Sequence, residues 1–164
     1  MFASQLTSAI NHDRHMSTVY RGSFARDELP KPDLSKNSAY IVNSSKSTEK
    51  GSHWFLICLY PRAKRAVFFD SLAEPPSKYG PEITKWLKST GLSIECNTKR
   101  IQGFGSVYCG LFVLFALYYL SRGYALKRMI KTFSGKNYSA NDQKVALFVW
   151  VKFKFNARQI LLTL

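Results

Sequence analysis

The feature that most constrains this chain is a glycine-bearing loop, residues 101–108, that leads straight into the apolar run Leu111–Leu120. As a helix this run would span about 15 Å, roughly half of the ~30 Å hydrocarbon core of a bilayer. It therefore predicts a buried central helix and not a membrane span. Cys109 stands where the loop gives way to the helix, and a thiol there meets unpaired N–H groups and the positive end of the helix dipole. Both favour the thiolate, which is the nucleophilic form.

The charge of the chain is strongly positive and unevenly placed. Lysine and arginine number 24 against 10 aspartates and glutamates, which gives a net charge of +14. From Cys96 onward, eleven basic residues face a single acid, Asp142. Such a field attracts polyanions, so nucleic acid is the first partner to consider and an anionic membrane surface is the second. A basic surface with no specific ligand is the remaining interpretation.

Length, composition and cysteine content bound the class of protein. With 164 residues, of which 46% are apolar and 15% aromatic, a single globular domain is the simplest expectation. The three cysteines, Cys58, Cys96 and Cys109, are odd in number and form no Cys-x-x-Cys pair. The first residues lack the pattern of a secretory signal. We expect a reducing intracellular compartment, or a virion assembled in one, rather than secretion, and we expect no metal site.

The order of the secondary-structure patterns favours an α+β fold, because strand patterns come first along the chain and helical patterns follow. This order predicts a small antiparallel or mixed sheet packed against the central helix. We expect a short helix around residues 6–10, a surface loop over 20–37, strands over 39–43, 53–60, 65–70 and 92–97, and helices over 82–88, 109–120, 124–133 and 141–149, the last with Asn141 as N-cap.

A nucleophilic thiol needs a base that takes its proton and a third group that orients the base. The connection 61–64 is of hairpin length, so His53 begins the first strand of an expected hairpin and Asp70 ends the second. In an antiparallel pair these two ends lie side by side. We therefore expect His53 and Asp70 to lie in contact, with His53 as the base for Cys109 and Asp70 as the group that orients His53. The alternative is a structural histidine beside a cysteine of the core.

The loop before Cys109 supplies a candidate oxyanion site. The side-chain amide of Gln102 and the backbone N–H of Cys109 are donors that could together hold a developing negative charge. Trp54 follows the histidine and is expected to shield it from water. A phosphate-binding loop is the alternative, but the spacing of the three glycines is not Gly-x-Gly-x-x-Gly and no Walker lysine follows.

At these positions the sequence resembles adenain, the family of adenovirus-type cysteine endopeptidases, and more distantly the SUMO-deconjugating proteases of the same clan. The segments that carry the resemblance are Gly51-Ser52-His53-Trp54, Phe68-Phe69-Asp70-Ser71, Ile101-Gln102-Gly103 and Cys109-Gly110-Leu111-Phe112. Their order along the chain is that of the family, with Asp70 where adenoviral members typically carry Glu. The likeness covers roughly residues 17–150. It implies a permuted papain-like arrangement with His53, Asp70 and Cys109 as catalytic residues and Gln102 in the oxyanion hole.

The resemblance also implies a function. Members of the family process capsid and core precursors during particle maturation, commonly at Gly-Gly-like sites, and they need no metal. We accordingly expect a monomer in the virion and the host nucleus, from a small DNA virus or a self-synthesising DNA transposon. Adenoviral members use DNA as an activator and bind a short activating peptide, so both are candidate partners. The residues that we assign to DNA contact are Lys99, Arg100, Arg122, Lys127, Arg128 and Lys131.

Two other functions remain open at this point. A deubiquitinase or SUMO-type isopeptidase would use the same four active-site residues. A non-enzymatic DNA-binding protein would use only the basic half of the chain, with Cys109 as a structural residue. The tail 151–164 follows the expected catalytic core, about 17–150, and its pattern suits a strand, an amphipathic partner-binding segment or a basic arm equally.

Overall fold

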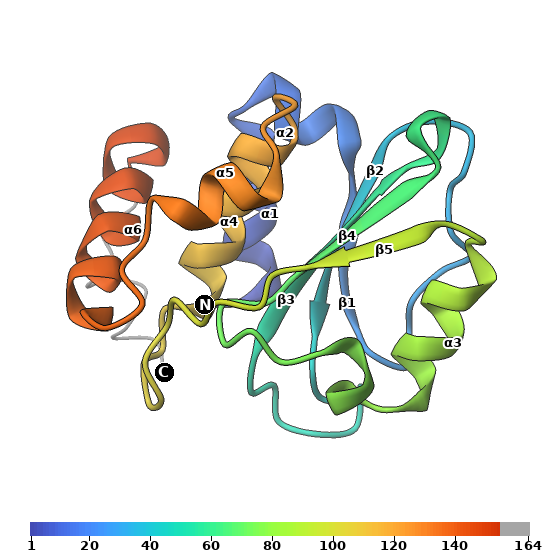
Figure 1. Ribbon diagram of the computed structural model, residues 1–164, viewed down its shortest axis with the longest axis horizontal. Coiled ribbons are helices and arrows are strands. Elements are labelled where there is room, and N and C mark those ends of the chain that lie inside the picture. The colour runs from blue at the N-terminus through green and yellow to red at the C-terminus, as the bar shows by residue number, and fades with distance from the viewer. Residues whose placement is uncertain (155–164) are drawn as a thin grey trace.

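A five-stranded mixed sheet forms the middle of the molecule in the computed structural model, which describes residues 1–154 (Figure 1). Its strands lie in chain order, so each strand pairs with the next. The outer pairs β1–β2 and β4–β5 are parallel, and the inner pairs β2–β3 and β3–β4 are antiparallel. The strands are β1 (Tyr20–Ala25), β2 (Ser38–Asn43), β3 (Trp54–Tyr60), β4 (Arg65–Phe69) and β5 (Ser93–Cys96).

Helices cover both faces of this sheet (Figure 1). One face carries α1 (Ala3–Asn11), α2 (Arg14–Val19), α4 (Cys109–Leu120), α5 (Leu126–Lys131) and α6 (Tyr138–Phe153). The other face carries α3 (Pro81–Ser89), and the short 3-10 helices η1 (Pro61–Ala63) and η2 (Pro76–Tyr79) lie in the connections. The α+β class with a central cysteine-bearing helix, predicted from the sequence, is confirmed.

Alternating side chains of the inner strands divide the core into two parts. Successive residues of a strand point to opposite faces, so Ile41 and Leu56 pack beneath α4 while Val42 and Phe55 pack toward α3. Both faces of β2, β3 and β4 are therefore apolar. This explains why these strands appear in the sequence as nearly continuous apolar runs.

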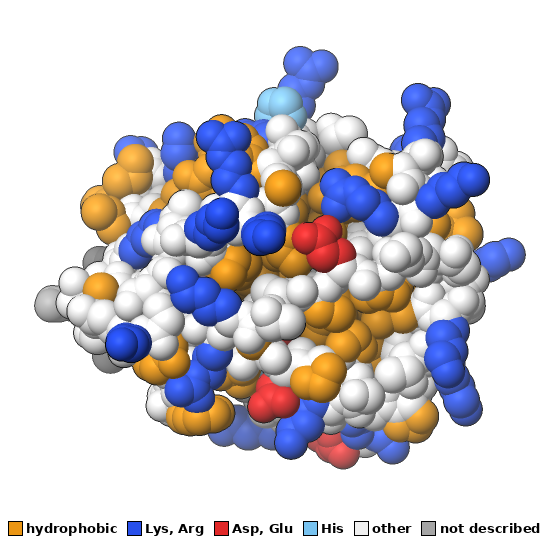
Figure 2. Space-filling view, in the orientation of Figure 1, with side chains coloured by type: hydrophobic (Ala, Val, Ile, Leu, Met, Phe, Trp, Pro, Cys, Tyr) orange, Lys and Arg blue, Asp and Glu red, His pale blue; other side chains and the backbone are white. Residues whose placement is uncertain are grey.

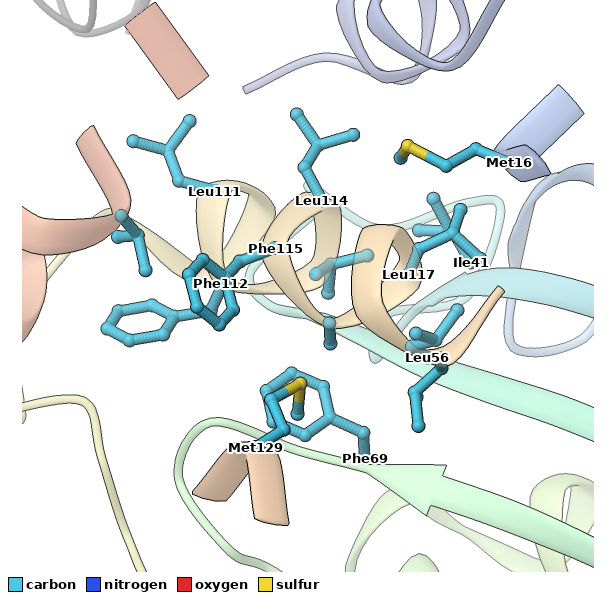
Figure 3. Packing of buried hydrophobic residues seen from close by; sticks show 14 of the residues in the cluster. Met16, Ile41, Leu56, Phe69, Leu111, Phe112, Leu114, Phe115, Leu117 and Met129 are labelled. Carbon is cyan, nitrogen blue, oxygen red and sulfur yellow. The ribbon is translucent and has the colours of Figure 1, made fainter. Parts of the chain in front are cut away.

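Helix α4 is buried almost all the way round (Figure 3). Leu114 and Leu117 are fully buried beside Met16 of α2, and Phe112 packs against Phe133 after α5. A helix that is apolar on every side belongs in the interior. Packing on all sides fixes the axis of α4 and so the position of Cys109 at its first turn.

Three sequence predictions need correction. Residues 20–25 were expected in a loop but form β1, which gains its hydrogen bonds from β2 at the edge of the sheet. The hydrophobic core takes in residues before 17, because Leu6 and Ile10 of α1 are fully buried in it. Helix α6 begins before Asn141: Asn137 caps it by accepting from Ala140 N–H.

The third correction concerns the start of the tail. Residues 151–153 complete α6 instead of opening a separate segment. The interpretations offered for residues 155–164 lie outside the described part of the chain. Within residues 1–154, no helix is both long enough and apolar enough to cross a membrane.

Candidate active site

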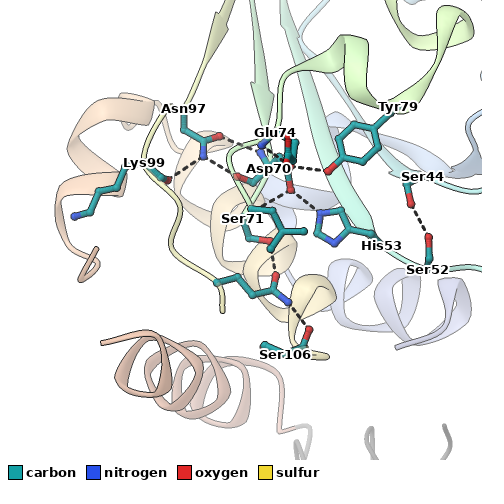
Figure 4. Close-up of polar contacts among 12 residues, drawn as sticks. Ser44, Ser52, His53, Asp70, Ser71, Glu74, Tyr79, Asn97, Lys99 and Ser106 are labelled. Atoms are coloured by element: carbon teal, nitrogen blue, oxygen red, sulfur yellow. Dashed lines mark hydrogen bonds and ion pairs between the residues drawn. The ribbon is translucent and has the colours of Figure 1, made fainter. Parts of the chain in front are cut away.

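The two ends of the β3–β4 hairpin bring a histidine and a carboxylate together. His53 immediately precedes β3, and Asp70 immediately follows β4. His53 Nε2 lies 2.5 Å from Asp70 Oδ1 (Figure 4). Their side chains are 11% and 1% exposed, so bulk water screens the pair little. The register of the hairpin thus places this pair as the sequence predicted.

Asp70 is held from every side (Figure 4). Its Oδ2 accepts from the Tyr79 hydroxyl at 2.7 Å and from the Glu74 N–H, and its Oδ1 also accepts from the Leu72 N–H. The side chain of Asn97 accepts from the Asp70 N–H and donates to the Asp70 carbonyl. These hydrogen bonds fix the buried carboxyl group, so that it can orient the imidazole.

Cys109 begins α4 and faces His53 across the cleft. Burial on its own raises the pKa of the Cys109 thiol, but the hydrogen bond and positive charge of His53, together with the Trp54 N–H, lower the pKa below the ordinary thiol value. First-turn N–H groups of a helix have no acceptor within the helix, and they add to this effect. The thiol is poised to ionise.

The pKa of the His53 imidazole shifts in the opposite direction, upward. Burial lowers the pKa of His53, but hydrogen bonds to Asp70 and Cys109 and the charges of both groups raise it to about 9. Because Nε2 faces Asp70, the other ring nitrogen, Nδ1, faces the Cys109 sulfur. The lowered pKa of Cys109 and the raised pKa of His53 together favour a thiolate paired with an imidazolium. Such a pair attacks a carbonyl carbon and then returns the proton to the leaving amine.

Gln102 lies in the same cleft and is 2% exposed. Its Nε2 donates to the Ser106 carbonyl at 2.6 Å, and its Oε1 accepts from the Ser71 hydroxyl at 2.5 Å. The amide nitrogen carries a second N–H. That N–H and the Cys109 backbone N–H are the donors that the arrangement offers to an oxyanion.

A cleft of about 510 Å³ runs over these groups. One wall comes from residues 50–54, the other from residues 102–107, and the N-terminal residues 1–3 close one side. Trp54, expected to shield the histidine, lines the cleft and donates from Nε1 to the Met1 carbonyl at 3.0 Å. A Cβ on Gly110 would lie 2.8 Å from the Met1 sulfur, so a larger residue there would displace the Met1 side chain.

Several functional residues escaped the sequence analysis. Tyr79 and Asn97 contact Asp70, Ser71 contacts Gln102, and Asn141 of α6 donates to the Ile101 carbonyl. All four contacts join segments that are nine or more residues apart. Of these four residues, only Ser71 could have been found from the sequence, because it directly follows Asp70 in the segment Phe68-Phe69-Asp70-Ser71.

The structure brings together only part of the basic set. Lys99, Lys127 and Lys131 line one groove beside β5, and Figure 2 shows basic side chains gathered over α5. Arg122 pairs with Asp13 at 2.5 Å and so is partly neutralised. Two arginines stack on aromatic rings elsewhere: Arg100 on Phe104 and Tyr138, and Arg128 on Tyr124.

The other two cysteines differ sharply from Cys109. Cys58 is buried in the core, and burial raises its pKa to about 12. Cys96 is exposed on β5, and partial desolvation with the neighbouring Glu95 raises its pKa. Of the three thiols, Cys109 alone has a lowered pKa. Among residues 1–154, no group of three or more His, Cys, Asp or Glu side chains could hold a metal ion.

A thiol that shares a proton with an imidazole, next to donors for a carbonyl oxygen, defines a cysteine-type peptidase. The family model described as adenovirus endoprotease matches residues 32–138, well over half of the chain. The matched segment contains His53, Asp70, Gln102 and Cys109. The chain belongs to this family, which confirms the resemblance found in the sequence. A comparison with curated proteins finds no match.

Two solved structures with TM-scores of 0.50 and 0.52 share the fold. The C-terminal Ulp1 protease domain, in complex with Smt3, the yeast ortholog of SUMO, is 15% identical with a TM-score of 0.50 over 89% of this chain and 76% of its own. ChlaDUB1 of Chlamydia trachomatis is 14% identical with a TM-score of 0.52 over 93% and 73%. The ASFV pS273R protease is 19% identical with a TM-score of 0.42 over 65% of this chain. This chain covers only 43% of that protein's length.

Proposed function

We propose that this protein is an endopeptidase that cleaves capsid and core precursor proteins of a virus or virus-like element during particle maturation. The observation that carries the proposal is the buried His53–Asp70 pair, 2.5 Å apart, facing a cysteine whose pKa is lowered. Membership of the adenovirus endoprotease family supports the choice of substrate class. The enzyme acts in the virion and the host nucleus.

The cleft suits a substrate with small residues at the cleavage site. Gly51 and Ser52 stand on one wall and Gly103 and Gly105 on the other, beside the bulky rings of Trp54 and Phe104. Small residues on both walls let an extended substrate backbone come close to Cys109. Cleavage follows Gly-Gly-like sequences in this proposal.

DNA stimulates the enzyme by binding its basic surface. The lysines Lys99, Lys127 and Lys131 share one groove, and the chain as a whole carries +14 charges. DNA that bears capsid or core proteins would hold enzyme and substrate on one polyanion. A short activating peptide is a second candidate partner.

Incubation with the capsid proteins encoded beside this chain, with and without DNA, tests the proposal. The expected result is cleavage at discrete sites, faster with DNA, with new C-termini that end in small residues. Cys109→Ala serves as the control, because it removes the nucleophile and leaves the helix intact. Cleavage by Cys109→Ala at the wild-type rate would overturn the assignment.

An isopeptidase specific for a ubiquitin-like modifier is the second candidate. The fold that this chain shares with Ulp1 and ChlaDUB1 favours it, and such conjugates also present a Gly-Gly terminus. A parallel assay with SUMO and ubiquitin conjugates separates the two candidates. Release of the modifier at a higher kcat/KM than precursor cleavage would establish the isopeptidase instead.

A further inference from the structure

We propose that Ser71 is a positioning residue that aims the Gln102 amide at the oxyanion formed on Cys109. The proposal rests on the peptidase function proposed above. Ser71 is 1% exposed, and its hydroxyl donates to Gln102 Oε1 at 2.5 Å (Figure 4). Gln102 has a flexible side chain, so its use as a donor requires something that holds its orientation.

The partners of Gln102 admit one orientation of the amide. The Ser106 carbonyl can only accept a hydrogen bond, so the atom 2.6 Å from it has to be Nε2. Oε1 then faces the Ser71 hydroxyl, which donates to it. A reversed amide would set two carbonyl oxygens against each other in a buried place, which is unfavourable because both oxygens would then lack a donor.

Ser71 also fixes the backbone on which Gln102 stands. Its carbonyl accepts from the Ile101 N–H at 2.9 Å and from the Gln102 N–H at 3.0 Å. Three hydrogen bonds therefore join Ser71 to the segment Ile101–Gln102. The opposite side of that segment is held by Asn141, which donates to the Ile101 carbonyl.

The dipeptide Asp70-Ser71 contacts both the catalytic base and the oxyanion donor. Asp70 orients His53, and the next residue, Ser71, orients Gln102. Asn97 holds the Asp70 backbone through its N–H and its carbonyl. The end of β4 thus sets the distance between the base and the oxyanion donor. Loss of the Ser71 hydroxyl leaves Oε1 without its donor, so that the Ser106 carbonyl alone still holds the amide.

Three measurements on Ser71→Ala separate positioning from a merely structural role. The first is hydrolysis of a fluorogenic peptide that ends in Gly-Gly before the reporter group. The second is the affinity of the matching peptide aldehyde: Cys109 Sγ adds to the aldehyde carbon, and the carbonyl oxygen gains the electron pair where the tetrahedral intermediate carries its charge. The third is the rate of Cys109 alkylation by iodoacetamide, a displacement of iodide that forms no oxyanion.

We expect Ser71→Ala to lower kcat about tenfold or more, but no further than Gln102→Ala, with KM unchanged, since oxyanion donors act in the transition state. Aldehyde affinity should fall by a similar factor, while Cys109 alkylation stays within about twofold. Ser71→Thr, which keeps the hydroxyl, should restore most of the rate. Ser38→Ala is the matched control: it removes a hydroxyl that is 2% exposed and lies away from the cleft.

Wild-type kcat and aldehyde affinity in Ser71→Ala would overturn the proposal. So would an alkylation rate that falls in step with kcat, because the hydroxyl would then support the Cys109–His53 pair or the fold. If the wild-type protein neither hydrolyses the peptide nor binds the aldehyde, the proposed function itself is refuted, and this inference with it. If the wild type does both, the outcome for Ser71→Ala concerns the inference alone.

Discussion

At the scale of single residues, two titrations with opposite shifts govern the active site. The pKa of Cys109 is lowered and that of His53 is raised to about 9, so thiolate and imidazolium coexist between the two values. As pH rises, alkylation of Cys109 should reach its plateau below the pKa of an ordinary thiol. Above about pH 9 the thiolate persists but His53 loses the proton that the leaving amine needs. Peptide hydrolysis should therefore decline there while alkylation stays fast.

Parallel pH profiles of kcat/KM and of iodoacetamide alkylation measure this difference between hydrolysis and alkylation above about pH 9. A profile in which hydrolysis continues to rise past pH 10 would show that His53 is not the acid of the reaction. So would an alkylation rate that follows the titration of a free thiol.

Tyr79 offers a second test at this scale. Its hydroxyl donates to the buried carboxylate of Asp70 at 2.7 Å, and hydrogen bonds to charged groups contribute about 1.5–3 kcal/mol. Tyr79→Phe should lower the free energy of unfolding by about that amount. Tyr60→Phe removes a hydroxyl bonded to a neutral carbonyl, that of Leu120, and should lower it by about 0.5–1.5 kcal/mol. Equal losses in urea unfolding would contradict a stronger hydrogen bond from Tyr79 to Asp70 than from Tyr60 to Leu120.

The sequence sufficed to predict the His53–Asp70 pair because a single hairpin, formed by residues close together in the chain, brings the two side chains into contact. His53 and Asp70 are seventeen residues apart, and antiparallel pairing alone brings them together. Tyr79, Asn97 and Ser71 could not be found in this way, because the path of the chain after β4 decides what lies beside Asp70. The ion pair of Arg122 could not be predicted for the same reason, because its partner Asp13 lies 109 residues away in the chain.

At the scale of elements, α4 is the part on which the site depends most. Leu114 is fully buried on this helix, so Leu114→Ala should lower the free energy of unfolding by about 2–5 kcal/mol through lost burial and the cavity left behind. Leu147→Ala on α6 is the control, since that side chain is 64% exposed and surface changes stay within about 0.5 kcal/mol. Similar losses for both variants in urea unfolding would contradict the buried position of α4.

The same scale shows where sequence patterns suffice. The continuous apolar run predicted α4 and its first residue. A helix that is buried on all sides is apolar at nearly every position, so it can be recognised in the sequence without knowledge of the fold. Strand β1 was missed because all six of its residues are half-buried and it includes Gly22, with φ at 138°. Pairing with β2 stabilises it, and a pairing partner is not visible in the segment itself.

At the scale of the whole molecule, the surface charge makes a prediction about DNA. Each phosphate contact contributes about 0.9 to the slope of log affinity against log salt concentration for duplex DNA. Changing Lys99, Lys127 and Lys131 together to Ala should therefore flatten that slope by about 2.7 units and weaken stimulation of the peptidase. A control of equal charge changes Lys78, Lys85 and Lys88, which lie on η2 and α3. Equal loss of slope in both variants would show that the field as a whole, and not this groove, binds DNA.

The central claim is that Cys109 is a nucleophile activated by His53, and site-resolved alkylation tests it most directly. The protein is treated briefly with iodoacetamide at pH 7, and modification of Cys58, Cys96 and Cys109 is followed by mass spectrometry. We predict that Cys109 reacts at least about tenfold faster than the exposed Cys96, that Cys58 stays unmodified, and that His53→Ala removes the advantage of Cys109, because the hydrogen bond and charge of His53 are the largest causes that lower its pKa against burial. A Cys109 that reacts no faster than Cys96, or as fast without His53, would contradict the account.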